Sequence, residues 1–174
     1  MVPIRLANMT EINLVKKEIN DLTGSESFNE IFSSNKRFLI QRDKKIKFIV
    51  IDAQLAEFLF KTLPNIQPFL YSAGVCLALF NSPKGPCKVT LEGLHLIAPY
   101  SHKKIILDSK ATLKFLYGRK IQLKETTTLL NANKNEKTLV FDQSNQVLGI
   151  GILKEDLLLI PVIDLGYYLR KKLK

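Results

Sequence analysis

The sequence predicts an α+β protein, with an antiparallel α/β domain over residues 1–96 and a small barrel-like domain over residues 97–174. Three observations support this division. Patterns typical of helices and strands alternate up to residue 96 and are joined by connections of hairpin length. Beyond residue 97 the strand-like segments become short and regularly spaced. The charge also changes, because residues 1–96 hold 12 Lys and Arg against 9 Asp and Glu, whereas residues 97–174 hold 14 against 7.

Two helices are predicted in the first 96 residues. The first begins at Thr10, ends at Gly24 and has these apolar residues at helical spacing: Ile12, Val15, Ile19 and Leu22. The second covers residues 53–63, because Asp52 can cap its start and Pro64 is expected to end it. Its predicted buried stripe consists of Leu55, Phe58, Leu59 and Leu63.

Strand patterns fill the rest of this part. Segments 37–42 and 45–52 form a predicted hairpin around Asp43 and Lys44. The apolar run 69–80 predicts a third strand, and its length also suggests a protein-docking surface beside its role in the core. A turn rich in Pro and Gly at 81–86 and a short strand at 87–91 follow.

In the second part, a strand over 103–107 leads into a short helix over 110–117, which Asp108 or Ser109 can cap. The predicted core positions of this helix are Ala111, Leu113, Phe115 and Leu116. Five further strands are predicted at 121–123, 126–130, 138–142, 146–153 and 157–163. A final helix over 164–174, capped by Asp164, is expected to seal the barrel and to direct Arg170 and Lys174 toward solvent.

The stretch FLYGRK, residues 115–120, points to a binding function. Gly118 suits a left-handed helix end, a conformation that costs other residues about 1–2 kcal/mol. Arg119 and Lys120 follow at once and place two cations beside a backbone that a ligand can approach closely. A simple glycine helix end with incidental basic residues is the alternative, and it explains Gly118 fully but the cations only loosely.

Four stretches and a C-terminal motif, in their order and spacing, resemble the Nip-seven family of archaeal and eukaryotic biogenesis factors for the large ribosomal subunit. They are SAGVCLALF (72–80), LHLIAPY (94–100), FLYG (115–118) and LGIGIL (148–153), followed by DLGYYLR (164–170). The resemblance covers nearly the whole chain from about residue 37. It implies an N-terminal α/β domain (1–96), a C-terminal PUA pseudo-barrel (97–174) that binds RNA, and a non-catalytic role in ribosome biogenesis and rRNA processing.

The same resemblance bears on the binding residues. Members of this family bind uridine-rich RNA through basic residues of the PUA domain, some of them just beyond the LGIG-type strand. At that place this sequence has a single basic residue, Lys154, followed by the acidic Glu155 and Asp156. We therefore expect basic residues elsewhere to supply the missing RNA contacts. The candidate RNA-binding residues are Lys103, Lys104, Tyr117, Gly118, Arg119, Lys120, Lys154, Arg170, Lys171 and Lys172.

The charge of residues 97–174 indicates a polyanionic partner, and a solvated lysine-rich surface is the alternative explanation. The resemblance implies uridine-rich single-stranded RNA and pre-rRNA as ligands, and ribosome assembly proteins as partners of the N-terminal domain. Two other functions stay open: a protein–protein adaptor in an assembly complex, and an accessory subunit of an RNA-modification enzyme. We expect a monomer.

The sequence predicts no catalytic activity, no cofactor and no metal. His95 and His102 have no nucleophile at a recognised spacing, and LGIGIL lacks the third glycine and the helix of a dinucleotide-binding loop. Cys76 and Cys87 are too few for a disulfide framework and form no zinc-ligand spacing. No apolar run approaches the roughly 18 residues that span a membrane, and no secretory signal pattern is found. We therefore expect a cytoplasmic protein in an archaeon, or a nuclear and nucleolar one in a eukaryote.

Overall fold

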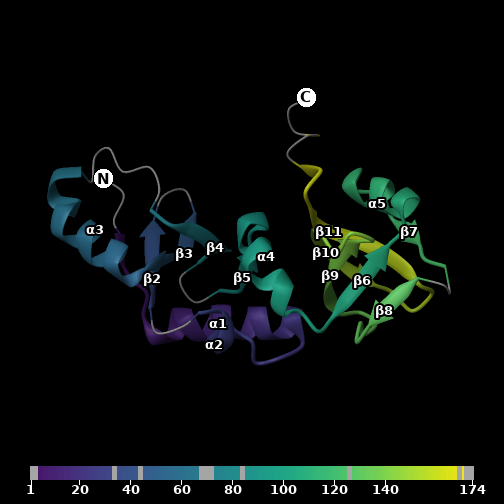
Figure 1. Ribbon diagram of the computed structural model, residues 1–174, viewed down its shortest axis with the longest axis horizontal. Coiled ribbons are helices and arrows are strands. Elements are labelled where there is room, and N and C mark those ends of the chain that lie inside the picture. Colours follow the sequence, from purple (N-terminus) through teal and green to yellow (C-terminus); the bar gives the residue numbers. More distant parts are fainter. Residues whose placement is uncertain are drawn as a thin grey trace. The chain divides into compact units, whose positions relative to one another are not determined.

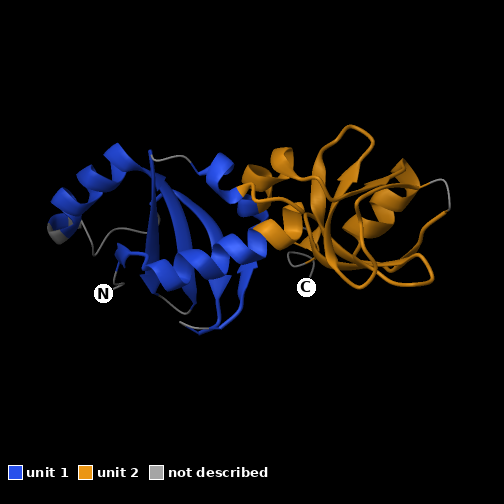
Figure 2. Ribbon diagram, turned by 90° about the horizontal axis from the view of Figure 1, so that it is seen from below, with its two compact units in different colours: residues 1–19, 28–93 blue, residues 20–27, 94–174 orange. Residues whose placement is uncertain are grey.

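The computed structural model describes residues 4–32, 35–42, 45–66, 73–82, 85–124, 127–167 and Arg170. The chain divides into two compact units (Figure 2). Unit 1 consists of residues 1–19 and 28–93, and unit 2 of residues 20–27 and 94–174. The chain thus contributes a short early segment to unit 2 before it completes unit 1.

Unit 1 is built on a five-stranded sheet in which every neighbouring pair is antiparallel. Its strands, in spatial order, are β1 (Ile4–Leu6), β2 (Lys36–Arg42), β3 (Ile46–Asp52), β4 (Val75–Phe80) and β5 (Cys87–Val89). The predicted hairpin is confirmed, since Arg42 pairs with Ile46, although the turn residues 43 and 44 lie outside the described residues. Strand β1 was not predicted because three residues form too short a pattern to detect.

Helices cover both faces of the unit 1 sheet (Figure 1). They are α1 (Met9–Thr23), α2 (Phe28–Ile31), α3 (Ala53–Ile66) and the start of α4 (Leu91–Ile97). Helix α4 passes into unit 2 at Leu94 and is continued there by the 3-10 turn η2 (Ala98–Tyr100). On one face, the Phe28 ring of α2 lies 5.5 Å from Phe38, which stacks 5.3 Å from Phe48. On the other face, α3 packs Ala56 and Leu59 against Leu39, Ile49 and Ile51 of β2 and β3. Neighbouring side chains of a strand therefore serve opposite layers, as strand geometry requires.

The first helix matches its prediction closely. Val15, Ile19 and Leu22 are fully buried, and Gly24 follows with a φ of 75°. The helix begins at Met9 because Asn8 and Glu11 form a capping box: the Asn8 side chain accepts from the Glu11 amide, and the Glu11 carboxylate accepts from the Asn8 amide, both at 2.9 Å.

The prediction for α3 was partly wrong. Asp52 caps the helix as expected, because its carboxylate accepts from the Gln54 amide at 3.0 Å. Leu55 and Phe58 are exposed, however, because the small Ala53 and Ala56 face the sheet and let the helix approach it closely. The helix also continues to Ile66 instead of ending at Pro64.

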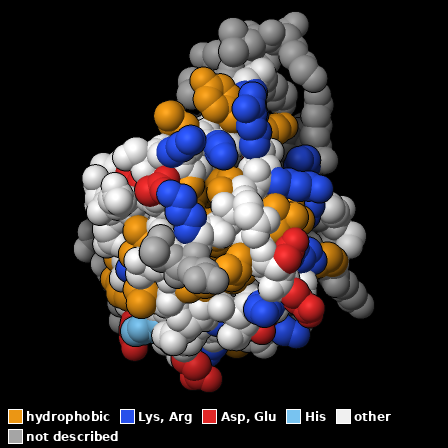
Figure 3. All heavy atoms as spheres, turned by 90° about the vertical axis from the view of Figure 1, so that its right-hand side faces the viewer, with side chains coloured by type: hydrophobic (Ala, Val, Ile, Leu, Met, Phe, Trp, Pro, Cys, Tyr) orange, Lys and Arg blue, Asp and Glu red, His pale blue; other side chains and the backbone are white. Residues whose placement is uncertain are grey.

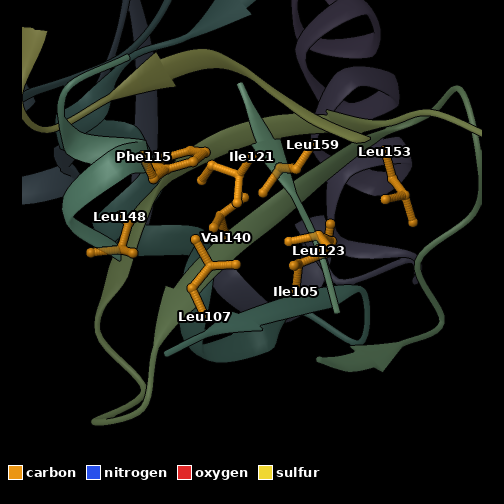
Figure 4. Packing of buried hydrophobic residues seen from close by; sticks show 9 residues of the cluster. All are labelled: Ile105, Leu107, Phe115, Ile121, Leu123, Val140, Leu148, Leu153 and Leu159. Carbon is orange, nitrogen blue, oxygen red and sulfur yellow. The ribbon is translucent and has the colours of Figure 1, made fainter. Parts of the chain in front are cut away.

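Unit 2 contains a curled, half-barrel sheet of six strands, which confirms the predicted pseudo-barrel. In spatial order they are β7 (Ile121–Gln122), β11 (Leu158–Asp164), β10 (Val147–Leu153), β9 (Lys137–Asp142), β6 (Lys104–Leu107) and β8 (Thr128–Leu130). All neighbours are antiparallel except β6 and β9, which are parallel. Helix α5 (Ser109–Leu116) connects β6 to β7, and its Phe115 is fully buried in the cluster of apolar side chains that fills the curl (Figure 4).

Three details of unit 2 differ from the prediction or extend it. Leu113 is exposed, because Ala111 and Phe115 lie one helical turn apart on the inward face and Leu113 points away from that face. At Gly149 the backbone of β11 leaves no room for a side chain, since an added Cβ would clash with the Ile163 carbonyl oxygen. The predicted C-terminal helix falls largely outside the described residues. In its described part, the Arg170 amide donates to the Gly166 carbonyl at 3.1 Å.

Within the described part of the chain, no helix has the length and apolar character needed to cross a membrane.

Candidate nucleic-acid interface

The turn after α5 has the geometry predicted from FLYGRK. Asp108 caps the start of α5 by accepting from the Ala111 amide at 2.7 Å. At the other end, Gly118 has a φ of 69° and donates to the Phe115 carbonyl at 2.8 Å. The Arg119 amide donates to the Lys114 carbonyl at 3.0 Å, which closes the turn and directs the chain into β7.

Five basic residues and no acidic residue lie between Ser109 and Lys124. All five are exposed, and we call them the α5–β7 basic patch: Lys110, Lys114, Arg119, Lys120 and Lys124. Figure 3 shows basic side chains grouped with apolar ones toward the top of the face of unit 2 that carries α5 and β7. Such a surface attracts polyanions, and the segment between Ser109 and Lys124 contains no carboxylate that would repel a phosphate.

Part of this patch was missed by sequence reasoning. Lys110 and Lys114 lie one turn apart on α5, and with Lys124 they line a cleft of about 150 Å³ between the helix and β7. Asp108 lies in the lining of the same cleft. The spacing of four residues and the absence of acidic residues were signals that could have identified these lysines from the sequence.

Tyr117 supplies an aromatic surface at the patch. Tyr117 is the residue that caps the C-terminal end of α5, and it is 64% exposed. The Arg119 guanidinium lies 5.8 Å from the Tyr117 ring centroid, within cation–π range. An exposed ring beside cations is the arrangement on which unpaired bases stack.

Lys103 is engaged within unit 2. Its Nζ lies 2.8 Å from the Glu136 carboxylate and donates to the Asp21 carbonyl at 3.2 Å. The bond from Lys103 holds the pKa of Glu136 below its usual value. The side chain is only 16% exposed, and the Lys103 amide also donates to Thr23, so this lysine ties residues 20–27 to the start of β6.

Two further candidate lysines occupy separate elements of unit 2. Lys104, at the start of β6, places its Nζ 4.8 Å from the centroid of the Phe141 ring. Lys154, just after β10, donates from Nζ to the Asn135 side chain at 3.1 Å. Neither lysine belongs to the α5–β7 basic patch, and each has one local partner that an RNA phosphate would have to share or replace.

The prediction that Arg170 points to solvent was wrong. Its guanidinium forms two hydrogen bonds of 2.9 Å with the nearly buried Asp164 carboxylate and donates to the Leu116 carbonyl. These hydrogen bonds, which the Asp164 carboxylate accepts, raise the pKa of Arg170. Arg170 also lies directly behind the Gly118 turn, because a Cβ added at Gly118 would be 3.0 Å from Nη2. The candidates Lys171 and Lys172 lie outside the described residues.

The two cysteines are free thiols in unit 1. Burial raises the pKa of Cys76 to about 11, which keeps the thiol protonated at neutral pH. Among the described residues, no three His, Cys, Asp or Glu side chains are grouped as metal ligands.

Comparison with known proteins identifies the module in unit 2. Residues 103–173 match the family model described as UPF0113 PUA domain, so this part of the chain contains a PUA domain, a module that suggests RNA binding. The whole chain is similar in fold to a PUA-domain protein of Aeropyrum pernix K1, crystallised as a tartrate complex. That match has a TM-score of 0.60 and 12% identity, and it covers 97% of this chain and 89% of the other.

A hypothetical protein of the hyperthermophilic archaeon Pyrococcus horikoshii OT3 is also similar, with a TM-score of 0.52 and 8% identity. That match covers 91% of this chain and 93% of the other. At these identities the similarity shows the shared fold. No curated protein matches the sequence.

Proposed function

We propose that this protein is a non-catalytic factor in large ribosomal subunit biogenesis that binds uridine-rich single-stranded segments of pre-rRNA through its PUA domain. The observation that carries the proposal is the α5–β7 basic patch around the exposed Tyr117. In this arrangement the cations neutralise phosphates and the ring accepts a base, which together favour an unpaired strand over a duplex. The role in pre-rRNA processing follows from the sequence resemblance described above.

The binding test uses the full chain and a fluorescently labelled oligouridine of about ten nucleotides, a length within the usual site size of small single-strand-binding folds. Fluorescence anisotropy should show tighter binding of this strand than of a duplex RNA of equal length. Replacing Tyr117 with Ala should weaken binding of the single strand more than binding of the duplex, because only unpaired bases stack on the ring. Equal affinity for both RNAs in the parent would contradict the proposal.

The cellular role needs a separate measurement. Crosslinking of the tagged chain in its own cells should recover pre-rRNA of the large subunit, and depletion should cause unprocessed precursor to accumulate. Recovery of only mature messenger or transfer RNA would argue against a role in ribosome biogenesis. We place the protein where pre-rRNA is processed, in the cytoplasm of an archaeon or the nucleolus of a eukaryote.

We further infer that unit 1 contacts assembly proteins. Leu55 and Phe58 of α3 are 59% and 63% exposed and lie three residues apart on one side of the helix. Exposed apolar side chains of this size suit a protein partner better than a nucleic acid. Pull-down with and without nuclease separates the two modes: partners that persist after RNA is digested, and that are lost on replacing Phe58 with Ser, support protein docking and the adaptor alternative.

A further inference from the structure

Unit 2 has a second concave feature, separate from the α5–β7 basic patch. It is a pocket of about 520 Å³ formed by the end of α4, by η2 and by the turn between β9 and β10. Its volume falls within the range of small-molecule sites. The floor is apolar and buried: Ala98, Phe141 and Val147 are 5%, 2% and 6% exposed. The rim carries three exposed polar side chains, those of His95, Asn145 and Gln146.

The turn that carries the two amides is fixed by its own backbone. Asp142 accepts from the Asn145 amide nitrogen at 3.0 Å and, through its carboxylate, from the Gln146 amide nitrogen at 2.9 Å. The Asp142 amide in turn donates to the Gln146 carbonyl at 3.0 Å. Asn145 adopts a φ of 59°, so the turn is tight. Within the described part of the chain, no residue forms a hydrogen bond with either side-chain amide or with the His95 ring.

The chemistry of this lining suits a flat, neutral and polar ligand. Among the residues that the structure describes, no lysine, arginine, aspartate or glutamate lines the pocket. A carboxamide offers an acceptor and two donors side by side, which is the pattern that pairs with the edge of a nucleobase. An imidazole and an apolar floor supply the surfaces on which a base face packs. A cation is nearby as well, because the Lys104 Nζ lies 4.8 Å from the Phe141 ring of the floor.

We propose that this pocket holds one unpaired base of the bound RNA, with the Gln146 and Asn145 amides reading its edge and Lys104 near its phosphate. The inference rests on the proposed function and deepens it. The α5–β7 basic patch supplies affinity that is independent of sequence, and the pocket supplies base recognition. This division follows the general distinction between phosphate contacts and base contacts.

The test compares the full chain with a double variant, Gln146→Ala and Asn145→Gly. Glycine suits the positive φ at Asn145, and both changes leave the backbone bonds of the turn intact. The probes are an oligouridine of about ten nucleotides and a set in which one position at a time is abasic. We expect one abasic position to weaken binding of the parent by about tenfold, the scale of a lost bidentate base contact. The double variant should bind the intact strand about tenfold more weakly and should no longer sense that abasic position.

Replacement of Arg119 and Lys120 with Gln is the matched control, and it should weaken binding of intact and abasic strands by the same factor. If every abasic strand binds the parent as tightly as the intact strand does, the pocket does not hold a base and the inference is overturned, while RNA binding itself stands. If no strand binds at all, the proposed function fails. Titration with uridine 5′-monophosphate then tests independently whether the pocket binds a base. Shifts of the Asn145 and Gln146 side-chain amide signals in NMR spectra would support a base site, and their absence at millimolar nucleotide would overturn it.

Discussion

Neutralising three lysines of the α5–β7 basic patch should change the salt dependence of RNA binding by a calculable amount. The change is Lys110, Lys114 and Lys124 to Gln, which keeps side-chain length and hydrogen bonding while removing three charges. All three side chains are exposed, so each substitution should alter the free energy of unfolding by less than about 0.5 kcal/mol. The effect on binding can therefore be read without a large change in stability.

The magnitude follows from counterion release. If the five cations of the patch each neutralise one phosphate, the slope of log affinity against log salt is about −3.5 for a single strand. Affinity then falls about 130-fold between about 50 and about 200 mM salt. With two cations left, the slope becomes about −1.4 and the loss over the same range only about sevenfold.

The assay is fluorescence anisotropy with labelled oligouridine at a series of KCl concentrations, with thermal unfolding recorded for each variant. The matched control replaces Lys17, Lys61 and Lys88 with Gln, which removes the same charge from exposed positions of unit 1. The control should keep the slope of the parent. A patch variant with an unchanged slope, or a control that flattens the slope equally, would show that RNA does not bind over α5 and β7.

Three further predictions concern stability. Replacing Arg170 with Gln should lower the melting temperature by several degrees, because the Asp164 side chain, only 7% exposed, then lacks its cation. In thermal unfolding, the double variant with Asp164→Asn should lose less stability than the sum of the two single variants, and additive losses would mean that the pair is not coupled. The hydrogen bonds from Arg5 lower the pKa of Glu11, so their stabilisation is present above the unfolded value of about 4.3 and is lost as pH falls through the lower folded value. The difference in unfolding free energy between the parent and Glu11→Gln should therefore shrink in urea titrations as pH falls below about 4.3, and a constant difference would refute this account. Gly118→Ala should destabilise unit 2 by about 1–2 kcal/mol in the same titrations, because φ is 69° there, whereas an equally stable variant would show that the turn tolerates a side chain.

Much of the fold was predictable because it is encoded in local patterns. The helical spacing of Val15, Ile19 and Leu22 identifies the buried face of α1 without reference to any other element. Gly118 signals its own left-handed conformation, and the cations that follow it are visible in the chain. The resemblance added the expectation of a PUA domain, which the family match over residues 103–173 supports.

What the sequence left undecided depends on residues far apart in the chain. Leu55 and Phe58 are apolar enough for the core, yet α3 buries Ala53 and Ala56 instead, because the choice of face is made by the sheet against which the helix packs. From the sequence alone, Arg170 cannot be distinguished from the other basic residues of the tail. In the structure, β11 approaches the end of α5, and Arg170 therefore has Asp164 and Leu116 as partners. His95 lies about fifty residues before the adjacent Asn145 and Gln146, and the three form no motif. Only the folding of the β9–β10 turn beside η2 brings them to one rim, because side chains that converge through tertiary packing carry no spacing signal along the chain.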